Sequence, residues 1–174
     1  MPNAVQMIKQ DHRKVASLFD KYKSTKGEEA KRRIAEQAIE QLEVHALVEE
    51  DIFYPAVEKA LGDGALIHDA LKEHQVIKEL IEELKTMEDY DEDFEEKWSE
   101  LVENVQYHVN EEESDLLLQA EESELDLVKY GTLMTERRAK AIEEIGASSM
   151  VYTAKLRPGS RTKKSTKHSE SRHA

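Results

Sequence analysis

The 174-residue chain has 38 acidic residues, 25 basic residues and no cysteine, which predicts one domain and excludes disulfide scaffolds, thiolate zinc sites and iron–sulfur clusters. Its net charge of −13 combines +5 in residues 157–174 with −18 in residues 1–156, so the folded body is not expected to bind nucleic acid. No apolar run approaches the ~20 residues of a membrane span, and the first residues lack the apolar stretch of a secretory signal, so we expect a cytoplasmic protein without membrane partners.

Four long helices are predicted, because apolar residues recur with a helical period and the chain has only three prolines and six glycines. They are expected at about residues 3–24, 28–60, 64–87 and 92–121. Asn3 is a candidate N-cap of the first helix, and Thr25 with Glu28 has the spacing of a capping box for the second. Short connections between four helices predict an all-α, up-down-up-down four-helix bundle.

The remainder of the chain is expected to add little to this bundle. A shorter C-terminal helical segment should follow Ser123, with an interruption at Gly131 and an end at Gly146. The basic, Ser-rich residues from 157 onward have almost no apolar side chains to bury and are predicted to be disordered. The expected domains are therefore a bundle at 1–122, a helical extension at 123–156 and a basic tail at 157–174.

The inward-facing stripe of each helix, read at spacings of three and four residues, is apolar except for a histidine. In the third helix, for example, the stripe contains Ile67, Leu71, His74, Ile77, Ile81 and Leu84. The four histidines are His12, His45, His74 and His108. In the second and fourth helices a glutamate follows one turn later on the same face, at Glu49 and Glu112.

The four histidines are predicted to lie at one height in the bundle. They stand 14, 18, 16 and 17 residues from the nearest connection, so their heights differ by only ~6 Å at ~1.5 Å per residue. A single histidine on such a stripe is usually a satisfied core residue, but four at one height with two buried carboxylates require a compensating positive charge. The sequence therefore predicts a metal site.

Two metal ions fit this set of donors better than one. Imidazole and carboxylate ligands without sulfur suit iron, manganese or zinc, and six ligands exceed the four of a closed zinc site. Two octahedral ions sharing the two glutamates would keep about four positions for a bridging oxygen and for exogenous ligands. Asp11, Glu50 and Glu73 adjoin the predicted ligands but lie ~100° off the stripe, and the sequence does not assign them a role.

The ordered pattern of His12, His45-xxx-Glu49, His74 and His108-xxx-Glu112 resembles the hemerythrin/HHE cation-binding family. The local strings Asp11-His12, Glu73-His74 and the run from His45 through Pro55 are also similar to that family. The resemblance covers about residues 5–120 and implies a non-haem di-iron centre, with two iron ions, an oxo or hydroxo bridge, and the six residues of the pattern as ligands.

Two positions depart from the oxygen-carrying members of that family. Those proteins have a second histidine four residues after the helix 3 histidine, where this chain has Lys78. They also place their last carboxylate five residues after the helix 4 histidine, at Glu113 here, so Glu113 is an alternative bridging carboxylate to Glu112. By this resemblance, one imidazole fewer implies an iron coordination position that is vacant or is taken by water or by another ligand, which favours oxidation or decomposition chemistry over oxygen carriage.

Tyr54 is a candidate additional ligand or redox residue. It follows His45 by nine residues, which is ~180° around an ideal helix, so it would face the site only if the helix bulged ahead of Pro55. Packing in the core is the alternative role for this side chain.

The sequence thus supports two classes of function. The first is a di-iron enzyme that decomposes hydrogen peroxide in a catalase-like way, or handles NO and reactive oxygen species. The second is a carrier or sensor that binds O2, NO or iron without turnover. A ferritin-like site is disfavoured, because no glutamate lies three residues before any of the four histidines. Monomer and dimer remain alternatives.

Overall fold

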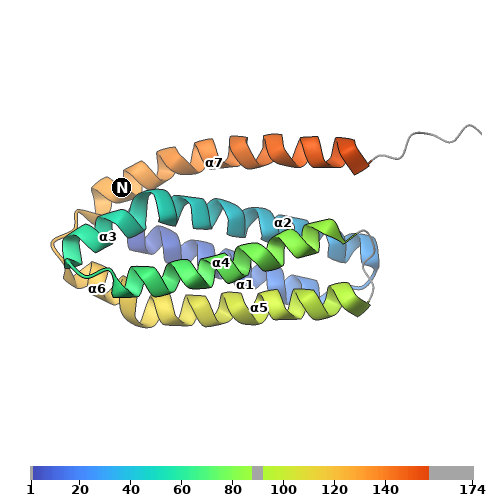
Figure 1. The fold of residues 1–174 in the computed structure, drawn as a ribbon, viewed down its shortest axis with the longest axis horizontal. Helices are drawn as coiled ribbons and strands as arrows, with labels where there is room; N and C mark the ends of the chain where they lie inside the picture. Colours follow the sequence, from blue (N-terminus) through green and yellow to red (C-terminus); the bar gives the residue numbers. More distant parts are fainter. Residues whose placement is uncertain (1, 88–91, 157–174) are drawn as a thin grey trace, which may run out of the picture.

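The computed structural model describes residues 2–87 and 92–156, the last nine as backbone. Its elements are α1 (Ala4–Ser24), α2 (Glu28–Val48), the π-helix η1 (Glu49–Phe53), α3 (Tyr54–Leu61), α4 (Ala65–Thr86), α5 (Glu92–Glu111), the π-helix η2 (Glu112–Leu116), α6 (Leu117–Glu122) and α7 (Leu127–Leu156). The described residues form no strand. Because η1 joins α2 to α3 and η2 joins α5 to α6, four long helices alternate in direction (Figure 1). The all-α bundle is confirmed, whereas the predicted tail at 157–174 lies outside the described residues.

The start of α1 agrees with the sequence, and the start of α2 does not. Asn3 Oδ1 accepts a hydrogen bond from the Gln6 backbone N–H at 3.2 Å, which makes Asn3 the N-cap as predicted. The predicted capping box is wrong. The N-cap of α2 is Gly27, whose φ of 94° favours glycine, and the Thr25 hydroxyl instead donates to the Lys21 carbonyl at 2.7 Å.

Helix α7 corrects the prediction of a shorter, interrupted segment. It is 30 residues long and passes through both Gly131 and Gly146 without a break. Gly131 is needed for a close approach: a Cβ atom there would lie 2.2 Å from the Pro2 carbonyl oxygen. The glycine that predicted an interruption therefore lets the N-terminal segment cross α7. This helix runs along the outside of the bundle against α1 and α2 (Figure 1).

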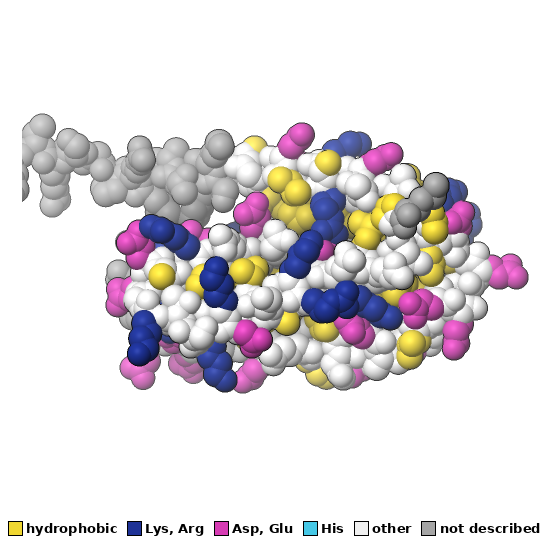
Figure 2. All heavy atoms as spheres, turned by 180° about the vertical axis from the view of Figure 1, so that it is seen from behind, with side chains coloured by type: hydrophobic (Ala, Val, Ile, Leu, Met, Phe, Trp, Pro, Cys, Tyr) yellow, Lys and Arg dark blue, Asp and Glu magenta, His cyan; other side chains and the backbone are white. Residues whose placement is uncertain are grey.

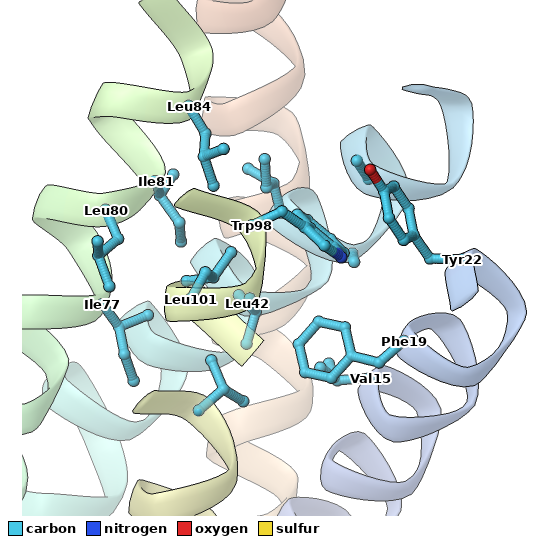
Figure 3. Close-up of a cluster of buried hydrophobic side chains, with 14 of the residues drawn as sticks. Val15, Phe19, Tyr22, Leu42, Ile77, Leu80, Ile81, Leu84, Trp98 and Leu101 are labelled. Atoms are coloured by element: carbon cyan, nitrogen blue, oxygen red, sulfur yellow. The ribbon is translucent and has the colours of Figure 1, made fainter. Parts of the chain in front are cut away.

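The core has two apolar clusters, and the four histidines lie between them. One cluster fills the end of the bundle near the α1–α2 connection and includes Val15, Phe19, Leu42, Ile77 and Trp98 (Figure 3). The other fills the opposite end and includes Ile8, Val48, Phe53, Ala70 and Leu117. The clusters share α1, α2 and α4, and η2 with α6 continues α5 into the second cluster, so each histidine has apolar neighbours on both sides along its own helix. Apolar side chains thereby lie at both ends of the imidazole layer.

The surface carries the remaining charge. Acidic and basic side chains are interspersed over the face shown in Figure 2. Leu71 was predicted to be buried but is 40% exposed, and the small side chain of Ala70 takes the buried position on α4 instead. Within the described residues, no helix combines the length and apolarity needed to cross a membrane.

Candidate metal centre

One histidine from each long helix enters the centre of the bundle. His12 lies on α1, His45 on α2, His74 on α4 and His108 on α5, and all four are buried. The Nε2 atoms of His74 and His108 are only 3.0 Å apart. The structure therefore brings together the four imidazoles that the sequence placed in one layer.

Glu49 and Glu112 supply the negative charge of this layer. Glu49 is fully buried, with Oε1 3.2 Å from His45 Nε2 and Oε2 3.3 Å from His74 Nε2. Glu112 Oε2 is 3.2 Å from His12 Nε2 and 3.9 Å from His108 Nε2. Each carboxylate thus lies between imidazoles from two different helices.

The donor atoms fall into two overlapping groups, each within 4.8 Å of one another. The first group is His12, His45, Glu49 and Glu112, and the second is Glu49, His74 and His108. Glu49 is common to both. Among the described residues, several buried atoms that could bind a metal ion have no hydrogen-bond partner. They are His12 Nε2, Glu49 Oε1 and both Glu112 oxygens. Buried carboxylate oxygens without a hydrogen bond are costly, so this arrangement fits bound cations.

The outer nitrogen of each of these four histidines faces a carboxylate. The Nδ1 contacts are His12 to Glu113 at 2.7 Å, His45 to Asp11 at 3.6 Å, His74 to Glu50 at 2.8 Å and His108 to Glu73 at 2.7 Å. A carboxylate at Nδ1 favours a proton on that nitrogen, which leaves the Nε2 lone pair free to bind a cation. Asp11, Glu50 and Glu73 adjoin the predicted ligands in the sequence, but their spacing does not reveal this role.

Glu112 and Glu113 are distinguished by the direction of their side chains. Glu112 is buried with its oxygens among the imidazoles, whereas the Glu113 side chain is 39% exposed and contacts the outer nitrogen of His12. Glu113, the alternative bridging carboxylate, therefore lies on the outside of the donor layer. Lys78 also lies outside it, because its ammonium pairs with Glu50 at 2.6 Å.

The π-helix η1 turns Tyr54 toward the site. A π turn contains one residue more than an α turn, so it rotates the following side chains by about one residue position, or ~100°. Tyr54 is only 1% exposed, and its hydroxyl lies 3.2 Å from both Glu49 Oε2 and His74 Nε2. The bulge ahead of Pro55 on which an inward Tyr54 depended is present. The second π-helix, η2, was not predicted, and no proline marks it.

The carboxylates control the ionisation of the buried histidines. Burial by itself would lower the pKa of His45, but the Glu49 and Asp11 carboxylates outweigh it and raise that pKa to about 10. Burial opposes the same effect at His74, where Glu49 and Glu50 raise the pKa to about 9. Burial, reinforced by Glu112 and Glu49, raises the pKa of the Tyr54 phenol. Without a bound metal ion, the His45 and His74 imidazoles are therefore positively charged at neutral pH.

A small cavity adjoins the donor layer, and a groove leads toward it. The cavity, of about 20 Å³, touches all four imidazoles and has walls made of Val15, Leu42, Ala46, Ile77, Val105 and Val109. It has room for about one molecule of the size of water. A groove of about 410 Å³ between α1 and α5 shares His12, Val15, Val105 and Val109 with the cavity. The cavity is therefore large enough only for small molecules.

Comparison with other proteins bears on the same region. An uncharacterized hemerythrin-like protein of Schizosaccharomyces pombe is 32% identical over 108 residues, which are 61% of this chain and 53% of that protein. A protein of a Nostoc species described as a DNA nickase is 29% identical over 114 residues, which are 66% of this chain and 32% of that protein. The chain spans about half or less of the length of these curated relatives.

The fold is also found in a crystal structure. A hemerythrin HHE cation-binding domain-containing protein from Mycobacterium kansasii matches with a TM-score of 0.72 over 90% of this chain and 94% of that chain, at 22% identity, which bears on the fold alone. The sequence pattern of the family described as "Hemerythrin HHE cation binding domain" matches residues 3–120, which contain all four histidines and both buried glutamates. The chain belongs to the hemerythrin HHE cation-binding domain family.

Proposed function

We propose that the site holds two iron ions with an oxo or hydroxo ligand between them. One ion would be held by His12, His45, Glu49 and Glu112, and the other by Glu49, His74 and His108. The two overlapping donor groups, and the buried carboxylate oxygens that have no hydrogen bond, support this assignment. Glu112 is favoured over Glu113 as the second carboxylate ligand because its oxygens face the imidazoles.

We further propose that the centre decomposes hydrogen peroxide, converting two H2O2 into two H2O and one O2. The observation that carries this proposal is the small number of donors in the second group, where three protein ligands leave coordination positions open on a six-coordinate ion. Lys78, at the position of the additional histidine in oxygen-carrying relatives, pairs with Glu50 and supplies no donor.

The chemistry and the protein have separate parts in this proposal. A pair of iron ions can take up and return the two electrons that peroxide disproportionation transfers. The four Nδ1-to-carboxylate contacts hold the imidazoles in one orientation, so the site needs little rearrangement during turnover. The enclosing apolar clusters exclude bulk water, and the cavity admits only small molecules.

Oxygen evolution tests the proposal. Iron-loaded wild-type protein should release O2 from peroxide, and His74→Ala should lower the rate at least about a hundredfold by removing a donor from the second group. His68→Ala is the matched control, because His68 lies exposed on the same helix and should leave the rate unchanged. Equal rates for wild type and His74→Ala, or a rate no higher than that of free iron, would reject peroxide decomposition.

Tyr54→Phe tests whether the phenol is a ligand. We propose that Tyr54 binds iron or serves as a redox residue, since its hydroxyl lies between Glu49 and His74. Its raised pKa means that a phenolate at neutral pH would require a bound cation. The expected result is loss of a visible phenolate-to-iron band and about tenfold slower turnover. Tyr107→Phe, at a 58% exposed position, should change neither. An unchanged spectrum and rate would assign Tyr54 to packing.

Reversible binding of O2 or NO is the second candidate function. The cavity supports this function, because its walls are apolar apart from the imidazoles and Asp11 and its size suits a diatomic gas. A spectral change that appears with the gas, reverses on its removal and occurs without peroxide turnover would establish a carrier or sensor in place of an enzyme.

A further inference from the structure

Helix α7 lies outside the residues that match the family pattern, and it reaches the candidate metal centre through one side chain. Met134 and Ala141 are completely buried on the face of α7 that packs against the bundle. Arg138 lies on the same stripe, four residues after the first and three before the second. A guanidinium on such a stripe requires a buried partner, because an unpaired charge there would be strongly destabilising.

That partner is Asp11. Arg138 Nη1 donates to Asp11 Oδ1 at 2.8 Å, and Nη2 donates to Oδ2, so the guanidinium binds both carboxylate oxygens. Asp11 Oδ2 in turn lies 3.6 Å from His45 Nδ1, and His45 Nε2 lies 3.2 Å from Glu49. A continuous polar chain therefore connects α7 to the glutamate shared by the two donor groups.

Asp11 differs from the other three outer carboxylates. It is the most buried of them, and its contact with a histidine is the longest. Glu50 is paired with Lys78 from within the bundle, and among the described residues Glu73 and Glu113 contact no cationic side chain other than a histidine. Lys14 contacts only Oδ1 of Asp11, at 3.6 Å, whereas Arg138 binds both oxygens. Arg138 therefore fixes the carboxylate orientation on which the 3.6 Å contact with His45 depends.

We propose that Arg138 is a positioning residue of the metal centre, which holds Asp11 so that His45 is aimed at the cation of the first donor group. This inference rests on the proposed two-metal centre. It makes the docking of α7 and the occupancy of the first group thermodynamically linked, so each stabilises the other.

An anaerobic Fe(II) titration against a chromophoric chelator tests the proposal. Arg138→Gln should weaken one of the two iron equivalents about tenfold and leave the other unchanged, because His45 belongs to only one donor group. The matched control is Arg137→Gln. Arg137 also joins α7 to the bundle, with Nε 2.6 Å from Asp51, and a second contact to Glu144 within α7, but Asp51 contacts no ligand histidine. The Arg137→Gln protein should bind both iron equivalents with wild-type affinity.

Two further variants separate positioning from folding. Arg138→Lys should recover part of the lost affinity, since an ammonium can pair with Asp11 but cannot grip both oxygens. Asp11→Asn should weaken the same iron equivalent, and adding Arg138→Gln to it should cause no further loss, because the arginine acts through the carboxylate. The difference in Tm between iron-loaded and metal-free protein should shrink in Arg138→Gln but not in Arg137→Gln.

The proposal is overturned if Arg138→Gln lowers the metal-free Tm as Arg137→Gln does while both iron affinities stay at the wild-type values. Independent, additive losses in Asp11→Asn and Arg138→Gln would also overturn it. The wild-type titration shows separately whether the centre binds two irons, and peroxide turnover is scored in its own assay, so a failure of the proposed function is distinguishable from a failure of this inference.

Discussion

Glu49→Ala is expected to abolish iron loading almost completely, from about two ions per chain to well below one. Glu49 is fully buried and is the donor common to both groups, so its removal takes a ligand from each ion at once. Glu112→Ala should have a smaller effect and retain about one ion, because Glu112 belongs to the first group only. Metal analysis after anaerobic Fe(II) loading and removal of free iron gives both values.

The control for these variants is Glu111→Ala, which removes an exposed glutamate next to Glu112 and should retain both ions. Circular dichroism shows whether each variant keeps its helices, since loss of Glu49 leaves the charges on His45 and His74 without their shared carboxylate. A folded Glu49→Ala protein that still binds two ions would contradict the proposed ligand set.

Iron affinity is expected to rise about a hundredfold between pH 6 and pH 8. The neighbouring carboxylates overcome burial and raise the pKa of His45 to about 10 and that of His74 to about 9, so both imidazoles are protonated over this range. Each ion must displace one of these protons before it binds, which gives about a tenfold gain in apparent affinity per pH unit. Anaerobic Fe(II) titrations at pH 6, 7 and 8, with an indicator for released protons, measure this slope.

The metal-free protein should show the opposite trend in stability. A histidine whose pKa is raised on folding stabilises the fold below its unfolded pKa of about 6.5, and this contribution is lost as the pH rises through the folded value. The Tm of chelator-treated protein should therefore fall between pH 7 and pH 10, whereas the Tm of the iron-loaded protein should be much less sensitive to pH.

An iron affinity independent of pH from 6 to 8, without proton release, would show that the imidazoles are already neutral.

The layer of donors could be predicted because a bundle interior allows so few explanations for a polar residue. A histidine on an apolar stripe must lie inside, and short connections fix how far along the helix it lies. For this reason the spacing alone placed His12, His45, His74 and His108 together. The fold class follows from the same periodicity.

The remaining features depend on contacts between helices, which the spacing along one helix does not report. The outer carboxylate of His45 comes from α1 and that of His74 from η1. A π turn depends on local hydrogen bonding. Pro55, just after η1, indicates that the hydrogen bonding changes there, whereas no residue indicates η2. Gly131 predicts an interruption of the helix, and its role is seen only when the N-terminal segment is placed across it.

The outer carboxylates give the centre a pseudo-twofold axis. The residue before His12 holds His45, and the residue before His74 holds His108; the residue after Glu49 holds His74, and the residue after Glu112 holds His12. The axis is broken at two pairs of equivalent positions, where Tyr54 corresponds to Leu117 and Lys78 to Ala16. Ala16 lines the groove beside His12, and Tyr54 contacts His74. The two donor groups therefore differ in their surroundings, with a groove beside His12 of the first group and a phenol beside His74 of the second.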